Sequence, residues 1–249
     1  MRRIYQDEWH GIKFIDFAEV SSRRLADVEF YRSFYKYFLT RYHDWSGLDP
    51  EWLSLKLQTA EFLKKKLAGH KDTRILSVGC GLGAIEKSFL ESGYIDLDVT
   101  EVAPEPLAWI KNFISPDRIF VGTFPQCIPQ NKTYDLMLFL GVESFLNQDE
   151  LITMLKNANR YLSRQGRCIL VSWSSEPSDI LRNTIFVLKE IIKDFFGILH
   201  IRNRGQFWGY SRKRSEFLEA MKLSGFNNID DGMFVKKTRW DTYWIEGSK

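Results

Sequence analysis

The stretch Arg74-Ile-Leu-Ser-Val-Gly-Cys-Gly-Leu-Gly83 decides the fold, together with Glu101 eighteen residues further on. Its apolar residues 75–78 predict a short buried strand, which breaks into three glycines spaced two apart before a helical pattern over 84–92. Glycines at such a turn permit positive φ and let a ligand approach the backbone. A second strand over 97–101 would bring Glu101 to the same sheet edge, where its carboxylate can accept hydrogen bonds from ribose hydroxyls. We therefore expect a site for an adenosine-containing cofactor.

The composition is that of a globular protein with room for a full core. At 249 residues, a single domain over 1–249 is the simplest interpretation. The net charge of +3 is too small to indicate nucleic-acid binding, and no apolar run approaches the ~20 residues that span a membrane. The first twenty residues lack the apolar core of a signal peptide. We expect a cytoplasmic protein whose oligomeric state stays open.

The three cysteines and four histidines give no sign of a metal site. Three is an odd number, and neither residue type shows metal-ligand spacing. A reducing compartment without disulfides, and no bound metal, are therefore predicted.

Strand and helix patterns alternate through the middle of the chain. Strands are expected at 74–78, 97–101, 118–121, 134–140 and 167–173, and helices near 84–92, 104–113 and 149–163. Such alternation implies parallel strands joined by right-handed crossovers. We divide the chain into an N-terminal cap or lid over 1–46, with a helix at 24–42, a cofactor-binding core over 47–173, and a substrate-side part over 174–249.

The last part of the chain follows a different rhythm. An amphipathic helix over 177–196, a second helix over 212–224, and two strands near 228–235 and 239–245 are expected. The final pair can form a hairpin at the sheet edge. The resulting prediction is an α/β, Rossmann-like, doubly wound seven-stranded sheet with an N-terminal helical cap.

The glycines alone do not identify the cofactor. Gly79-x-Gly81-x-x-Ala84 also fits the looser dinucleotide fingerprint, so an NAD-dependent oxidoreductase remains an alternative.

Several motifs in order resemble the class I S-adenosylmethionine-dependent methyltransferases. Residues 76–83 are similar to their first motif, 99–104 to their ribose-binding second, and 134–143 to their fourth strand and following loop. Residues 155–173 resemble the helix, glycine turn and fifth strand, while 205–210 and 224–226 look like the later region of small-molecule members. The resemblance implies S-adenosylmethionine as cofactor, and as its ligands Gly79, Cys80, Gly81, Gly83, Glu101, Val102, Thr123, Phe124, Leu140 and Gly141.

The chain departs from the family pattern at two places. Ser77 stands where the family usually has an acid near the methionine part of the cofactor, and Gly122-Thr123-Phe124 replaces a loop that usually holds an acid near the adenine amine. Thr123 can accept that hydrogen bond and Phe124 can stack on the base. A non-catalytic cofactor-binding subunit of the same fold is therefore kept as a further alternative.

Candidate residues for binding the methyl acceptor and for catalysis follow the fourth and fifth predicted strands. Glu143 is a candidate base or ligand of a substrate hydroxyl, with helix capping as the alternative, and Tyr210 is a second candidate catalytic group. Guanidinium groups can clamp phosphate or carboxylate, and aromatic rings can stack on sugars. Candidate substrate-binding residues are Ser144, Trp173, Arg204, Trp208 and Arg212, although a solvated loop explains the arginines equally well. We expect methyl transfer to an oxygen or nitrogen of a small molecule or of a glycan-like acceptor, with phosphorylated and nucleotide-linked acceptors included.

Overall fold

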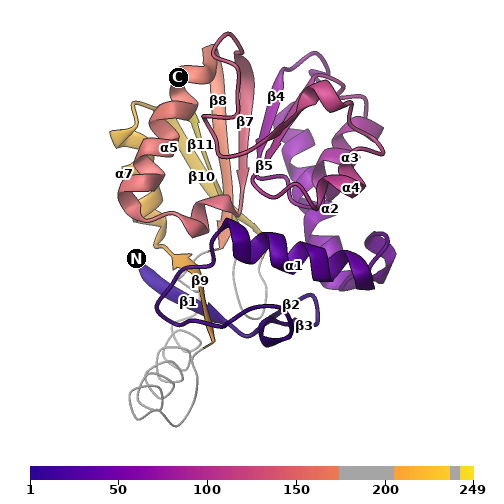
Figure 1. The fold of residues 1–249 in the computed structure, drawn as a ribbon. Helices are drawn as coiled ribbons and strands as arrows, with labels where there is room; N and C mark the ends of the chain where they lie inside the picture. The colour runs from indigo at the N-terminus through magenta and orange to yellow at the C-terminus, as the bar shows by residue number, and fades with distance from the viewer. Residues whose placement is uncertain (174–204, 236–241) are drawn as a thin grey trace.

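A seven-stranded sheet forms the centre of the molecule in the computed structural model, which describes residues 1–173, 205–235 and 242–249 (Figure 1). The strand order is β10-β11-β8-β7-β4-β5-β6. The strands from β8 to β6 run parallel, whereas β11 is antiparallel to both β8 and β10. Their bounds are β4 Ile75–Val78, β5 Leu97–Glu101, β6 Ile119–Val121, β7 Tyr134–Leu140, β8 Leu162–Trp173, β10 Asn227–Val235 and β11 Thr242–Ser248. The predicted fold class is confirmed.

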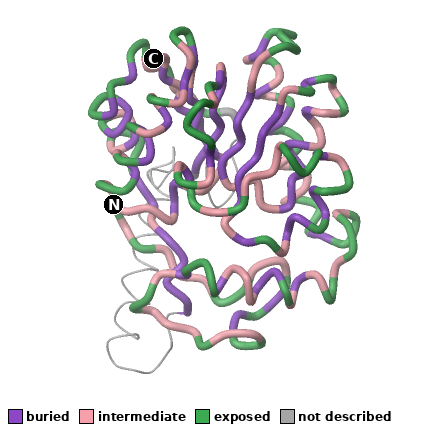
Figure 2. The backbone as a smooth tube through the Cα atoms, turned by 45° about the horizontal axis from the view of Figure 1, so that its top comes forward, coloured by how far each residue is buried: buried purple, intermediate pink, exposed green. Residues whose placement is uncertain are grey.

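Helices cover both faces of this sheet, because the strands carry apolar side chains on both faces. Leu76 and Val78 pack on α5 (Gln148–Tyr161) and α7 (Arg214–Leu223). Ile75, one residue away and therefore on the opposite face, packs on α2 (Pro50–Lys66), α3 (Ala84–Glu91) and α4 (Leu107–Ile110). Figure 2 shows the strands buried and the connecting loops exposed.

The helices begin where the sequence supplies side-chain caps. Asp27 accepts a hydrogen bond from the Phe30 amide at 2.9 Å and opens α1 (Val28–Arg41). Asp49 does the same for α2, with Pro50 as the first helical residue, and Asn147 forms a capping box with Glu150 at α5. These side chains satisfy amides that have no partner within their helices.

Three expected elements differ from those observed. The helix predicted at 104–113 is a single turn, α4, and the residues before it form i→i+3 turns, as in the Leu107 amide that donates to the Pro104 carbonyl at 3.2 Å. The glycine turn predicted at 164–166 is instead an irregularity inside β8, between the pairs Tyr134↔Leu162 and Leu136↔Arg167. In the expected C-terminal hairpin, β11 is inserted between β8 and β10, so β10 alone forms the edge. The helix expected over 177–196 lies outside the described residues.

A cap crosses the carboxyl ends of the parallel strands. Helix α1 lies along that edge in Figure 1, as predicted, and below it run β1 (Arg2–Gln6), β2 (Glu8–Trp9) and β3 (Ile12–Lys13). Strand β1 pairs antiparallel with β9 (Gln206–Ser211), some two hundred residues away, a pairing that the sequence analysis did not predict. The described residues also include four short 3-10 turns. Two follow elements of the cap, η1 Phe14–Asp16 and η2 Trp45–Gly47; η3 Pro116–Arg118 precedes β6, and η4 Val142–Phe145 follows β7. No helix in the described ranges is long and apolar enough to cross a membrane.

Candidate functional site

The glycine turn and Glu101 meet at the carboxyl ends of β4 and β5. Glu101 is buried, and its carboxylate accepts hydrogen bonds from the amides of Gly81 at 2.8 Å and Ala103 at 3.1 Å. An ionised carboxylate has about four acceptor positions, so two remain for a ligand. Because β4 lies between β5 and β7, the chain connections leave this point in opposite directions, and open α/β sheets bind their ligands in a crevice at such a point; we refer to this edge of the sheet as the crevice.

The glycines of the turn serve different purposes. All three have positive φ: +71° at Gly79, +57° at Gly81 and +74° at Gly83. A Cβ at Gly83 would lie 2.9 Å from Ile110 and Phe113, so this position is required for packing of α3 against α4. At Gly81 the nearest atom to an added Cβ is the Tyr35 hydroxyl, 3.5 Å away. Gly81 thus lies in ordinary contact distance of the cap, beneath the Tyr35 hydroxyl.

Cys80 is held within the turn and is half-buried. Its amide and that of Gly79 both donate to the Thr100 carbonyl at 3.0 Å. Burial raises the pKa of the Cys80 thiol well above its usual value, and the neighbouring charges of Glu86 and Glu101 raise it further. Cys80 is therefore a neutral lining residue.

Two tyrosines of α1 cover the turn. The Tyr31 hydroxyl is buried without a hydrogen-bond partner among the described residues. Burial raises the pKa of both Tyr31 and Tyr35, and the nearby Glu101 carboxylate adds to the shift in each. A buried hydroxyl without a partner costs about 1–3 kcal/mol, so Tyr31 offers a free hydrogen bond beside Glu101.

A buried acid that the sequence analysis did not select stands next to Ser77. The Ser77 hydroxyl donates to Glu86 Oε1 at 2.6 Å, and both residues are buried. Burial raises the pKa of Glu86, while the Ser77 hydrogen bond and the charge of Lys56 lower it. The period of β4 places Ser77 on the α3 face of the sheet, and Glu86 lies in the first turn of α3, three residues after Gly83. The spacing of three residues between Gly83 and Glu86 could have identified this acid from the sequence, because it places Glu86 in the first turn of the helix that follows the glycines.

Lys56 lies on α2, the helix that packs beside α3. It is half-buried, and its Nζ forms no ion pair or hydrogen bond with any residue in the described part of the chain; its recorded contact is the Trp52 ring, 5.6 Å away. Burial lowers the pKa of Lys56, opposed by the charges of Glu86 and Glu143. Lys56 therefore forms no direct ion pair with Glu86 or Glu143, although the charges of both act on it.

Glu143 is fully buried in the turn after β7. Its Oε2 accepts from the Gly141 amide at 2.9 Å, whereas Oε1 has no hydrogen-bond partner among the described residues. Burial raises the pKa of Glu143 to about 7; the Ser172 hydroxyl, near it but outside hydrogen-bond geometry with Oε1, lowers it, as do backbone amides and Arg212. A carboxyl with that pKa exchanges its proton at neutral pH.

Arg212 and Ser144 hold this turn in shape. The fully buried Arg212 guanidinium donates to the carbonyls of Glu143, at 2.7 Å, and Leu146, and to Gln148 Oε1 at 3.2 Å. The Ser144 hydroxyl donates to the Gly141 carbonyl at 2.7 Å. Because these donors are bound to protein acceptors, Arg212 and Ser144 are positioning residues in this structure, in contrast to the substrate contacts expected from the sequence.

The residues expected around the adenine divide into two groups. Phe124 is buried in the core against Phe139 and Tyr161, with ring centroids 5.9 and 5.8 Å apart, so its ring does not face the crevice. Thr123 is exposed in the loop after β6. Val102 and Leu140, at the ends of β5 and β7, are half-buried at the crevice edge.

The expected acceptor residues are scattered. Trp208 is 5% exposed and stacks on Phe14 at 5.1 Å, with Trp9, Phe30, Tyr31 and Phe145 around it. It is therefore a cap core residue. Tyr210 is half-buried against Phe207 on β9. Trp173 ends β8 with its side chain outside the described set, and Arg204 lies outside the described residues altogether.

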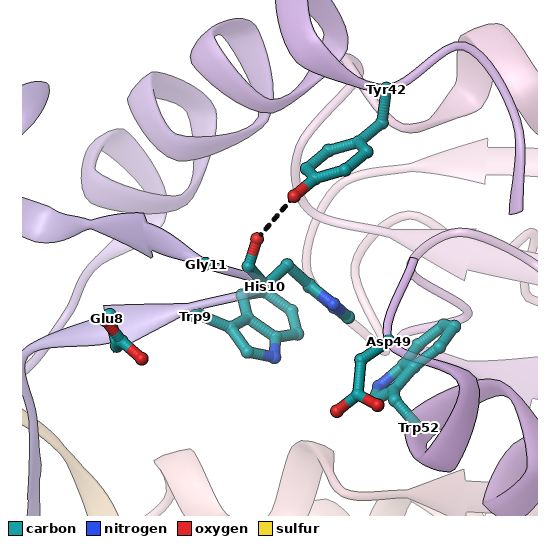
Figure 3. A pocket seen from close by; sticks show the side chains of 7 residues that line it. All are labelled: Glu8, Trp9, His10, Gly11, Tyr42, Asp49 and Trp52. Carbon is teal, nitrogen blue, oxygen red and sulfur yellow. Dashed lines mark hydrogen bonds between the residues drawn. The ribbon is translucent and has the colours of Figure 1, made fainter. Parts of the chain in front are cut away.

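A hollow of about 360 Å³ lies between the β2–β3 hairpin and the start of α2 (Figure 3). The His10 ring separates Trp9 from Trp52, with centroids at 4.8 and 4.9 Å, and the Tyr42 hydroxyl fixes the hairpin by donating to the His10 carbonyl at 2.8 Å. Burial lowers the pKa of His10 to about 4, so the ring is neutral, and its Nε2 has no partner in the described set. The lining residues are Glu8, Trp9, His10, Gly11, Tyr42, Asp49 and Trp52.

Comparisons of sequence give limited information. No family model matches the chain. An uncharacterized protein of Methanocaldococcus jannaschii is 24% identical over 163 residues, which cover 62% of this chain and 65% of that protein. The match therefore spans less than two thirds of the relative.

Comparisons of structure identify the fold. The magnesium protoporphyrin IX methyltransferase of Synechocystis, solved with bound S-adenosylhomocysteine, has a TM-score of 0.57 at 16% identity, over 83% of this chain and 88% of that one. An S-adenosylmethionine-dependent methyltransferase of Archaeoglobus fulgidus has a TM-score of 0.56 at 12% identity, over 78% and 94%. The chain thus has the fold of class I methyltransferases, and the predicted resemblance is confirmed at the level of fold.

Proposed function

We propose that this protein binds S-adenosylmethionine at the crevice above β4 and transfers its methyl group to a small acceptor. The observation that carries the proposal is the meeting, at one edge of a methyltransferase fold, of the Gly81 turn, the spare acceptor positions of Glu101 and the Tyr31 hydroxyl, which has no hydrogen-bond partner among the described residues. These groups fit an adenosine whose ribose hydroxyls donate to Glu101. The antiparallel β11 further separates the sheet from the all-parallel order of dinucleotide-binding folds, which disfavours the NAD alternative.

In this reaction the main task of the protein is to hold the acceptor atom in line with the methyl group of the cofactor. When bound, the cofactor would supply a sulfonium methyl group: an oxygen or nitrogen of the acceptor would form a bond to the methyl carbon while the carbon–sulfur bond breaks, with neutral S-adenosylhomocysteine as the leaving group. Covering the site with α1 excludes water, and holding the acceptor within ~3 Å of the methyl makes the step effectively intramolecular. Glu143 is our candidate for the proton acceptor, since its free Oε1 is buried past β7 and its pKa of about 7 suits a base at neutral pH.

We place the acceptor in the hollow between the hairpin and α2. Two rings join the hollow to the glycine turn: the Trp9 ring packs edge-on against Tyr35, with centroids 6.2 Å apart, and the Tyr35 hydroxyl lies next to Gly81. Trp9 and Trp52 offer flat apolar faces, and Glu8 and Asp49 offer carboxylates at its rim (Figure 3). Aromatic faces with hydrogen-bond acceptors suit a polyhydroxylated, sugar-like ring or an amine. These acids, together with the occupied Arg212, argue against the phosphorylated or nucleotide-linked acceptors considered from the sequence.

Calorimetric titration tests the cofactor. We expect S-adenosylmethionine and S-adenosylhomocysteine to bind in the micromolar range and NAD not to bind. Glu101→Ala should weaken binding of both by ~1–3 kcal/mol, because a hydrogen bond to a charged group is lost, while Glu91→Ala on exposed α3 surface leaves it unchanged. Binding of NAD alone, or an unaffected Glu101→Ala protein, would overturn the assignment.

Turnover separates an enzyme from a non-catalytic subunit of the same fold. An acceptor screen should detect formation of S-adenosylhomocysteine, and Glu8→Gln should raise the KM for the acceptor without changing cofactor affinity, because this exposed carboxylate lines the hollow only. A protein that binds the cofactor tightly but turns over no acceptor, in cell extract or in the screen, would favour the non-catalytic alternative.

A further inference from the structure

We propose that Glu86 and Lys56 bind the two charges at the amino-acid end of the cofactor, Glu86 its ammonium group and Lys56 its carboxylate. The inference rests on the proposed function, since it names the ligands of one part of that cofactor. It assigns a binding role to one residue from each of two helices that cover the same face of the sheet, α2 and α3.

Glu86 lies inside the site rather than on a surface of α3. Only 3% of it is exposed, and it is fixed by the hydrogen bond from Ser77 at the end of β4. Its charge acts on Cys80 and Glu101, which places it within electrostatic range of the glycine turn. Glu86 of α3 thus places a carboxylate beside Ser77, the position of β4 where the strand itself carries no acid.

Lys56 provides the opposite charge from the helix that packs beside α3, since Lys64 Nζ of α2 donates to the hydroxyls of Ser88 at 3.2 Å and Ser92 at 3.0 Å. More than 4 Å separates its Nζ from every carboxylate oxygen in the described ranges, since no ion pair is formed there, although Glu86 and Glu143 both act on it electrostatically. Withdrawing a charge from water without a close counter-ion is unfavourable, and both Lys56 and Glu86 are in this condition.

An α-amino acid group is complementary to this arrangement. It carries an ammonium and a carboxylate on one carbon, so it can bridge an acid and a lysine that are too far apart to pair directly. The bound zwitterion would stabilise the charged forms of both side chains.

Two ligands that differ only at this end of the molecule provide the test. S-adenosylhomocysteine carries the amino-acid group, whereas 5′-methylthioadenosine keeps the adenosine and sulfur without it. Both are titrated calorimetrically into the full chain and into the variants Glu86→Gln and Lys56→Met. Matched controls are Glu91→Gln and Lys65→Met, exposed residues of the same two helices.

We expect each site variant to lose tenfold or more in affinity for S-adenosylhomocysteine and less than threefold for 5′-methylthioadenosine, with both controls unchanged. Equal losses for the two ligands, or no loss, would overturn the inference while leaving the proposed function intact. If the unaltered protein binds neither ligand, the proposed function fails and this inference with it. Should Glu86→Gln not fold, the ratio of affinities in Lys56→Met decides the question.

Discussion

The two sides of the crevice, the glycine turn below and the cap above, are built in different ways. In the turn, consecutive residues of β4, α3 and β5 satisfy one another, as in the amides of Gly81 and Ala103 that donate to Glu101. The cap instead assembles aromatic rings from residues 9–52 and from β9, and it buries polar atoms of Tyr31, His10 and Trp45 without partners in the described residues. The contrast indicates that the turn is formed in advance and that the cap has the most to gain from a ligand.

The largest expected effect concerns the centre of the cap. Trp208→Ala should lower the free energy of unfolding by about 3–5 kcal/mol, because a nearly buried indole in contact with five other rings is removed. Ile95→Ala, at a side chain that is 72% exposed, is the control and should change little. Urea denaturation measures both. A small effect of Trp208→Ala would mean that the cap contributes little to stability, and the contrast between the two sides would weaken.

The second prediction concerns packing below the crevice. Gly83→Ala and Gly93→Ala both place alanine at positive φ, +74° and +86°, but only the former brings a Cβ to 2.9 Å from neighbouring side chains. We expect Gly93→Ala to cost about 1 kcal/mol and Gly83→Ala about 1–3 kcal/mol more. Equal losses in thermal denaturation would show that α3 can shift away from α4, and that the turn is less rigid than we describe.

The third prediction concerns Glu143, whose buried carboxyl makes the free energy of unfolding depend on pH. Its pKa in the folded protein, about 7, lies above the unfolded value of ~4.3, so folding favours the protonated form and the free energy of unfolding falls as pH rises between these values. Glu143→Gln removes this pH-dependent fall in the free energy of unfolding, because glutamine does not ionise. Its stability relative to the unaltered protein should therefore increase by about 2 kcal/mol from pH 5 to pH 8. A difference that is constant with pH would show that Glu143 is ionised throughout and is already compensated.

The smallest effect on stability is expected at Tyr31. Tyr31→Phe removes a buried hydroxyl that has no partner among the described residues, so the free energy of unfolding should change by less than about 1 kcal/mol, or increase. Affinity for S-adenosylhomocysteine should nevertheless fall severalfold. Tyr94→Phe, remote from the crevice in the core beside Phe89, serves as the control for affinity. Unchanged cofactor affinity in Tyr31→Phe would remove the hydroxyl from the site.

How much the sequence predicts follows the same division. Residues 74–101 specify their own structure, because an apolar run, glycines that permit positive φ and a helix start are all local signals. The fold class, the central strands and the approach of Glu101 to Gly81 could therefore be predicted. The role of Arg212 could not, since a run of arginines and aromatic residues looks the same whether its donors face a substrate or buried carbonyls such as that of Glu143.

By itself the sequence determined the order of elements, the doubly wound sheet and the position of the glycine turn, since each depends on residues close together in the chain. Tertiary structure alone decided which polar side chains share a site. It paired β1 with β9, brought Tyr31 over Glu101, and set Glu86 of α3 and Lys56 of α2 near each other. These contacts join segments whose separation in sequence carries no periodic signal, and they form only when the helices pack on the sheet.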